Sequence, residues 1–123
     1  MTLCFRIAGV DRAKYDRNEI NDLYMALKRE GKFKNPRENV LIFDTLDPTV
    51  LHFNTTRVVR MNPTDPFDIS RAEIEAREQV FEMFDFLKKN FEAFSDSYVI
   101  STGMQIGARE SRMTDGEYIL TES

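Results

Sequence analysis

The sequence predicts a single α+β domain over residues 1–123, with a mostly antiparallel sheet of about five strands and two helices packed on it. Short apolar segments with alternating polarity occur before, between and after two longer segments that have helical periodicity. Two of the strand segments are joined by a turn that contains proline, which is typical of a hairpin and therefore of antiparallel pairing.

The first expected strand covers residues 1–10. Leu3, Phe5 and Ile7 alternate with Cys4 and other less apolar neighbours, which is the two-residue period of a half-buried strand. The strand starts almost at the first residue without a leader, and we interpret this as a sign that the chain is a fragment of a larger protein.

The first expected helix covers residues 16–30. Asp16 is the expected N-cap, and Gly31 follows as a suitable C-terminal stop. The apolar positions form one stripe with the i, i+3, i+4, i+7 spacing of a helix that packs on a core: Ile20, Leu23, Tyr24 and Leu27.

A hairpin is expected next, with strands over residues 40–43 and 50–59. The segment between them, 44–49, is rich in Asp and Thr and contains Pro48, as turns are. The second strand carries an unusually polar row of side chains, namely His52, Asn54, Thr55, Thr56 and Arg57.

The second helix is expected over residues 70–91. Two prolines make the preceding segment, 60–68, a linker, because proline disfavours both helix interiors and interior strands. Ser70 is the expected N-cap, and Glu73 three residues later completes a capping box.

Apolar residues cover more than one face of this second helix. At about 1.5 Å per residue the helix is roughly 33 Å long, which is as long as a small domain is wide. We therefore expect some of its rings to be covered by another domain or by a homo-oligomer, with Phe81, Phe84 and Phe91 as the contacts. The alternative is that all of these rings fold into the local core.

Two more strands are expected near the C-terminal end, over residues 97–106 and 117–121. An Asp-Gly pair at residues 115–116 is the expected turn before the last strand.

Composition excludes several classes of function. The net charge of −4 argues against a nucleic-acid-binding protein, which needs a basic surface. No apolar run approaches the ~20 residues of a membrane span. The single cysteine cannot form an internal disulfide, so we expect a reducing compartment, the cytoplasm. One histidine and one cysteine predict no metal site.

The segment 106–112 is the best candidate for a binding site. Arg109 and Arg112 are three residues apart, Glu110 and Ser111 lie between them, and Gly107 precedes them. Arginine suits an anion site because its planar fork binds carboxylate or phosphate oxygens and keeps its charge. Gly107 suits a position where the backbone closely approaches another group.

The local conformation decides whether both arginines face the ligand. In a strand, side chains three apart point to opposite faces, so only one arginine faces the site and the other pairs with a carboxylate. In a turn or helix both share a face. We favour Arg109 as the residue that faces the site, with Glu110 and Arg112 orienting it. The alternative is a solvated hairpin with a salt bridge.

These residues resemble a known family. The run is similar to the signature G-(V/A)-R-E-(S/T)-R, followed by G-E-Y-x-L-T, of a family of FAD-dependent oxidoreductases, some members of which carry a xanthan lyase label. The segments 52–58, with H-F-N-T-T-R-V, and 69–80 also resemble that family. Glu78 departs from its pattern, because the family favours arginine there.

The resemblance implies that the chain is an internal, substrate-side fragment of such a flavoprotein, inactive alone. His52, Asn54 and Arg57 then join the segment 107–112 as expected cofactor- or substrate-binding residues. FAD is expected in the intact parent protein, with its FAD-binding region as the partner. No bound cofactor is expected on this chain alone, because the phosphate-binding motif G-x-G-x-x-G does not occur in its sequence. The alternative is a non-enzymatic α+β binding or oligomerisation module.

Overall fold

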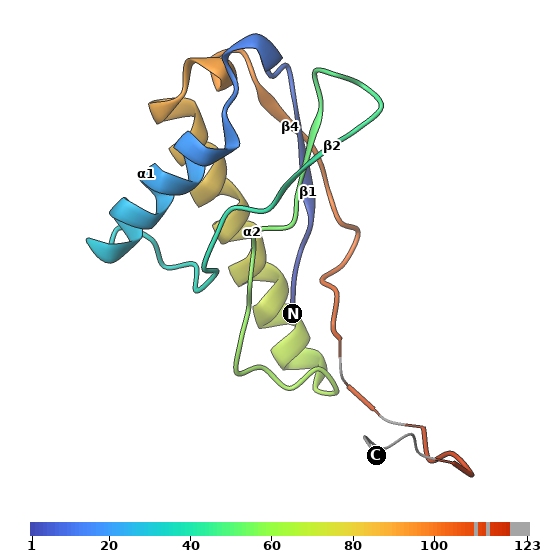
Figure 1. Ribbon diagram of the computed structural model, residues 1–123. Coiled ribbons are helices and arrows are strands. Elements are labelled where there is room, and N and C mark those ends of the chain that lie inside the picture. Colours follow the sequence, from blue (N-terminus) through green and yellow to red (C-terminus); the bar gives the residue numbers. More distant parts are fainter. Residues whose placement is uncertain (110, 113, 119–123) are drawn as a thin grey trace.

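The sheet has four strands in the order β2-β3-β1-β4, and both helices lie on one side of it (Figure 1). The computed structural model describes residues 1–109, 111–112 and 114–118. The elements along the chain are β1 (Phe5–Ala8), η1 (Arg12–Lys14), α1 (Arg17–Arg29), β2 (Ile42–Asp44), β3 (Leu51–Phe53), α2 (Pro66–Asn90), η2 (Glu92–Phe94) and β4 (Tyr98–Thr102), where η denotes a short 3-10 helix.

All pairs of neighbouring strands are antiparallel, which confirms the predicted fold class. Strand β1 is central and pairs with β3 and β4, and β2 pairs with β3 as the predicted hairpin. The described residues contain four strands instead of about five. The expected last strand lies largely on residues 119–121, outside the described residues, and Glu117 and Tyr118 are not in a strand.

The predicted strand over residues 50–59 is wrong beyond Phe53, where β3 ends. After that point the chain still runs beside the N-terminal segment, where the Thr56 side chain and the backbone hydrogen bonds between Val58 and Met1 hold it. The Thr56 hydroxyl accepts a hydrogen bond from Leu3 N at 2.8 Å and donates one to Leu3 O at 2.9 Å. A side chain that occupies both polar groups of Leu3 replaces the ladder that a continuing strand would have made.

Helix α1 begins where the sequence predicts. The Asp16 side chain accepts hydrogen bonds from the N–H groups of Asn18 and Glu19, as an N-cap does. Ile20 and Tyr24 are buried, so the predicted stripe faces the core. Gly31 follows the helix with φ of +75°, a conformation that favours glycine.

The predicted start of α2 at Ser70 is wrong, because the helix begins at Pro66. The Asp65 side chain caps it by accepting hydrogen bonds from Phe67 N and Asp68 N. Proline is well tolerated in the first turn, where its missing N–H would have no helical partner. Ser70 lies inside the helix, and its hydroxyl donates to Pro66 O at 2.9 Å.

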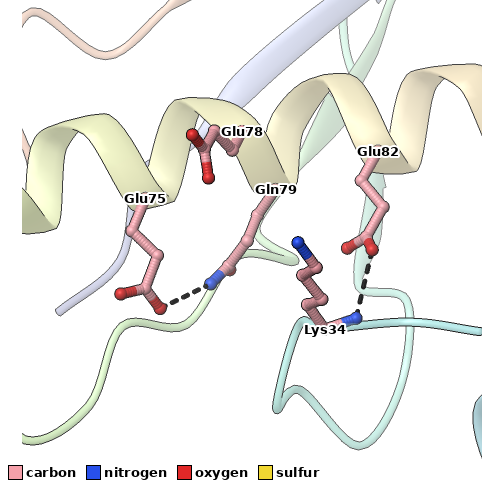
Figure 2. A pocket seen from close by; sticks show the side chains of 5 residues that line it. All are labelled: Lys34, Glu75, Glu78, Gln79 and Glu82. Atoms are coloured by element: carbon pink, nitrogen blue, oxygen red, sulfur yellow. Dashed lines mark hydrogen bonds between the residues drawn. The ribbon is translucent and has the colours of Figure 1, made fainter. Parts of the chain in front are cut away.

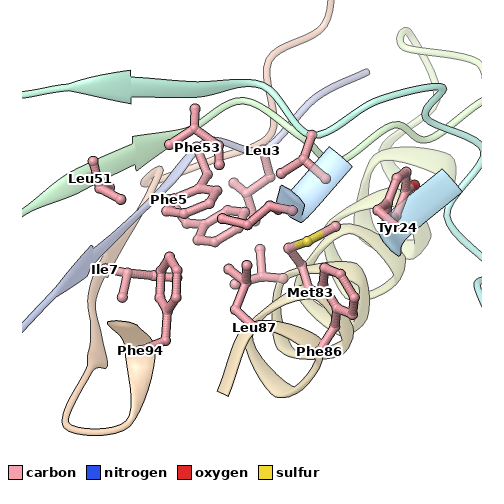
Figure 3. Packing of buried hydrophobic residues seen from close by; sticks show 14 of the residues in the cluster. Leu3, Phe5, Ile7, Tyr24, Leu51, Phe53, Met83, Phe86, Leu87 and Phe94 are labelled. Carbon is pink, nitrogen blue, oxygen red and sulfur yellow. The ribbon is translucent and has the colours of Figure 1, made fainter. Parts of the chain in front are cut away.

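The core lies between the sheet and α2 (Figure 3). The alternating residues of β1 and β3 point toward the helix, and Phe5 stacks on Phe53 with their ring centroids 4.9 Å apart. From α2, Met83 and Leu87 pack against this layer. The predicted alternation of buried residues in the first strand is confirmed, with Leu3, Phe5 and Ile7 all buried.

The phenylalanines of α2 and its C-cap differ in their surroundings. Phe86 is buried, with its ring edge-on to those of Tyr24 and Phe33. Phe84 and Phe91 are partly buried against the core, whereas the Phe81 side chain is more than half exposed. The local core therefore takes up some, but not all, of the rings that the sequence placed on this helix.

No helix in the described part of the chain combines the length and the apolar character that crossing a membrane requires.

Candidate functional site

The sheet face that carries no helix displays polar side chains. Because strand residues alternate between faces, the burial of Phe5 and Phe53 directs their neighbours Arg6 and His52 to the opposite face. Arg6 and His52 are directly opposed in the β1–β3 register. Alternation directs Cys4 and Asn54, which flank the strands, to this same face. Part of the polar row predicted from the sequence therefore lies together on one surface.

A groove of about 590 Å³ opens beside these residues. We call it the arginine groove, because three arginines from separate parts of the chain line it. It is lined by Arg37, Arg57, Arg109, Asn54, Cys4 and Gly107, among others. Each arginine reaches the groove from a different segment, so the fold assembles a charge cluster that is not contiguous in the sequence.

The backbone at Arg57 is fixed by a buried amide from α2. Gln79 accepts a hydrogen bond from Arg57 N at 2.8 Å and donates one to Arg57 O at 2.9 Å. The Gln79 residue is only 4% exposed. Both backbone polar groups of Arg57 are thus satisfied inside the protein. The Arg57 guanidinium then extends outward and pairs with Glu38.

The backbone at Arg37 is fixed in a similar way from the other side. The Asn35 side chain accepts a hydrogen bond from Arg37 N at 3.0 Å and donates one to Thr55 O at 2.9 Å, so it ties two segments of the groove together. The Tyr24 hydroxyl donates to Arg37 O at 2.9 Å. Among the described residues, the Arg37 Nε atom is buried and has no hydrogen-bond partner.

Arg109 reaches the groove because Gly107 pairs with the N-terminal segment. Gly107 N donates to Thr2 O at 2.8 Å, and Thr2 N donates to Gly107 O at 3.1 Å. A Cβ atom at position 107 would lie 3.3 Å from Thr2 O, so the backbone approach is close, as expected for this glycine. Arg109 follows two residues later and is exposed.

The groove carries net positive charge. Three guanidinium groups line it, and Glu38 neutralises one of them through its pair with Arg57. The pKa of the Glu38 carboxyl lies below its usual value, chiefly because its own backbone N–H donates to it and also because Arg57 does. Glu38 therefore stays ionised at neutral pH, and two guanidinium charges remain. Such a donor-rich groove can hold a carboxylate or a phosphate.

The residues predicted from the sequence divide between this groove and other places. Gly107, Arg109, Asn54 and Arg57 line the groove together. Ser111 and Arg112 are exposed, and the described residues from position 111 onward lead away from the sheet (Figure 1). Glu110 lies outside the described residues.

Arg37 is a groove residue that the sequence analysis missed. It lies in the polar loop between α1 and β2, where an arginine has no local signal of function. Contacts between residues far apart in the sequence bring this loop to the groove, among them the hydrogen bond from Asn35 to Thr55, twenty residues away, and the pair of Glu38 with Arg57.

His52 lines a smaller hollow that adjoins the groove, and Cys4 lines both. Burial lowers the pKa of the His52 imidazole, and the nearby Arg6 charge lowers it further. Burial also raises the pKa of the Cys4 thiol. Both groups are therefore neutral at neutral pH and add no charge to this surface.

A second pocket, of about 440 Å³, lies beside α2 and is acidic (Figure 2). Glu75, Glu78 and Glu82 line it with Gln79 and Lys34. Lys34 N donates to Glu82 at 3.1 Å and Gln79 donates to Glu75 at 3.2 Å, and the dashed lines in Figure 2 mark these two hydrogen bonds. Within the described part of the chain, no three His, Cys, Asp or Glu residues gather closely enough to hold a metal ion.

The chain does not fit the phosphate cradle of a dinucleotide. Such a cradle joins a strand of a parallel sheet to a helix through three glycines spaced G-x-G-x-x-G. The link from β1 to α1 has Gly9 followed by Asp11 and Lys14 at the other two positions, and β1 pairs only with antiparallel strands among the described residues.

A family model described as FAD dependent oxidoreductase matches residues 1–123, the whole chain. No curated protein and no solved structure matches it.

Proposed function

Because the chain belongs to the FAD dependent oxidoreductase family, we propose that it supplies substrate-side surface to a flavin-dependent oxidation. In this proposal the arginine groove holds an anionic group of the substrate. The observation that carries the proposal is the convergence of Arg37, Arg57 and Arg109, from three segments, on one groove.

The chemistry of the groove supports an anionic substrate. In flavoenzymes the cofactor supplies the electron chemistry, and the protein supplies binding and orientation. A guanidinium can donate two parallel hydrogen bonds to a carboxylate or phosphate, so it fixes the direction of the bound group as well as attracting it. Arg57 and Arg37 are suited to this orienting task, because buried side chains hold their backbones.

We assign Arg109 the role of completing the grip on the anion from the open side of the groove. The Gly107–Thr2 pairing anchors its segment, while its exposed side chain can still move to meet a ligand. Asn54 adds a side-chain amide in the same groove. His52, uncharged in the adjoining hollow, is suited to contact an uncharged part of the same substrate.

We also propose that the dinucleotide of FAD is held by a separate FAD-binding region and that this chain alone is inactive. The misfit of the β1–α1 link to a pyrophosphate cradle supports this. The purified chain should then show no flavin absorbance near stoichiometry after incubation with FAD and desalting. A flavin band retained at about one equivalent would contradict this part of the proposal.

The role of the arginines is tested in the protein that combines this chain with its FAD-binding region. Arg109→Lys keeps the charge but loses the fork, so substrate turnover at low substrate concentration should fall about tenfold or more, the effect of losing ~1.4 kcal/mol. Arg29→Lys, on the exposed surface of α1, is the matched control and should leave turnover unchanged. Equal turnover in both variants would remove Arg109 from the site.

A further inference from the structure

Helix α2 has a second apolar line in addition to the one that it buries. Its core side carries small and aliphatic residues such as Ala76, Val80 and Leu87, all with no exposure. On the opposite side Phe67, Ile74 and Phe81 are 75%, 63% and 57% exposed. We call these three residues the α2 stripe.

The spacing of the stripe is that of a helix–helix contact. Its members are seven residues apart, and such positions drift by only about 20° per repeat around a helix, so they form a nearly straight line. The line is about 21 Å long at 1.5 Å per residue. Single exposed apolar residues are ordinary on protein surfaces. Three in register at heptad spacing form one of the two rows of a helix–helix seam, and the polar residues Arg71 and Glu78 stand at the other row.

The charges beside the stripe indicate which helix fits it. Arg71 lies three residues before Ile74, and Glu78 lies four residues after it, on the same side of the stripe. A second copy in antiparallel orientation, related by a two-fold axis at Ile74, brings Arg71 of each copy beside the partner's Glu78. A parallel two-fold arrangement would instead put the Arg71 and Glu78 side chains of the two copies on opposite edges of the seam, where they cannot pair.

The same two-fold arrangement matches the apolar residues. Phe67 lies opposite the partner's Phe81, and Ile74 packs on the partner's Ile74. The apolar seam is therefore self-complementary, as an isologous dimer contact requires. The Arg71 side chain is 64% exposed and pairs with Asp68 of its own helix, and a surface pair of this kind contributes so little that Arg71 can exchange it for the partner's Glu78.

We propose that the α2 stripe is the contact surface of an antiparallel homodimer of this chain. The proposal does not depend on the function of the arginine groove, whose described lining residues lie outside α2. Of the rings that the sequence indicated for self-association, Phe81 is in this contact, whereas Phe84 and Phe91 pack against the core.

Sedimentation velocity of the purified chain over a dilution series tests the proposal. The chain should be mainly dimeric at about 100 micromolar and dissociate on dilution, because one pair of helices makes a small interface. Ile74→Glu places two like charges at the two-fold axis and should raise the dimer dissociation constant about tenfold or more. Leu46→Glu, which removes a fully exposed leucine elsewhere, is the matched control and should dimerise normally.

Charge reversal tests the orientation. Arg71→Glu and Glu78→Arg should each weaken the dimer severalfold, and the double variant should restore it. Circular dichroism verifies folding, and Phe81→Lys serves as a second seam variant. A monomer at about 100 micromolar, dimerisation that Ile74→Glu and Phe81→Lys leave unchanged, or a double variant without restoration would each overturn the proposal. If the chain is a monomer at that concentration, the α2 stripe is instead a contact surface for a different polypeptide.

Discussion

The segments 54–58 and 107–112 both bring an arginine to the same groove, but the protein holds them by different means. The first is anchored by buried side chains, Thr56 and Gln79, that satisfy the backbone on both sides. The second is attached through one backbone pairing of Gly107, after which its described residues are exposed.

The difference shows how rigidity and charge are divided in this surface. The anchored segment is suited to orient a bound anion. Its backbone is already fixed, so the Arg57 side chain loses little further conformational freedom when an anion binds. The exposed segment supplies charge that can adapt. Arg109 and Arg112, the arginines that the sequence analysis favoured, therefore lie in the less constrained of the two segments. The position of Arg57 depends instead on Gln79 of α2, a residue without any binding signal in the sequence.

The largest effect is expected at the anchor. Gln79→Leu keeps the volume of the side chain but leaves Arg57 N and Arg57 O without their partners. Unfolding free energy should fall by about 2–4 kcal/mol, the cost of buried polar groups left unpaired. Urea denaturation measures it, and Glu78→Gln, on the neighbouring exposed position, is the control. A loss below about 0.5 kcal/mol would mean that water replaces the amide and that the anchor is not structural.

A much smaller effect is expected where the second segment is attached. In Gly107→Val the new Cβ lies near Thr2 O, at 3.3 Å, but the glycine is exposed and the segment can shift by a few tenths of an ångström. The same denaturation assay should show a change of less than about 1 kcal/mol. A loss as large as that of Gln79→Leu would make the two segments equally constrained and would remove the contrast between them.

The smallest effect concerns pH. The pKa of His52 is lowered in the folded protein by burial, so the unfolded chain binds the proton more readily as pH falls below about 6.5. Stability from the neutral imidazole is present above that pH and is lost as the pH falls through the folded pKa. Between pH 8 and pH 5, wild type should therefore lose more stability than His52→Gln. Identical losses would place His52 in a solvent-like environment.

Local sequence signals predicted the fold class and α1 well. Asp16 and the stripe from Ile20 are neighbours in sequence, and the structure uses them as expected. The predicted start of α2 was wrong because two residues that could cap the helix, Asp65 and Ser70, are only five positions apart. Pro66 decides between them, since it fits the first turn of a helix that Asp65 caps.

The candidate site was predictable only in part, for a physical reason. Asn54, Arg57 and Arg109 stand in segments with an unusual density of polar residues, which the sequence shows directly. Arg37 joins them through Asn35, whose contact with Thr55 depends on the folded chain. In the sequence Gln79 has the pattern of an ordinary helix residue. Its hydrogen bonds to Arg57 form only when α2 packs against the segment 54–58 in the folded protein.

Titration of the ¹⁵N-labelled chain with inorganic phosphate, and separately with succinate, tests the central claim most directly. The account predicts that the amide signals of Asn54 and Gly107 shift and saturate at about 1–10 millimolar anion. Arg57→Met should abolish the shifts, and Arg29→Met should preserve them. Amide signals that do not move with either anion, or that move equally in Arg57→Met, would contradict an anion site in the arginine groove.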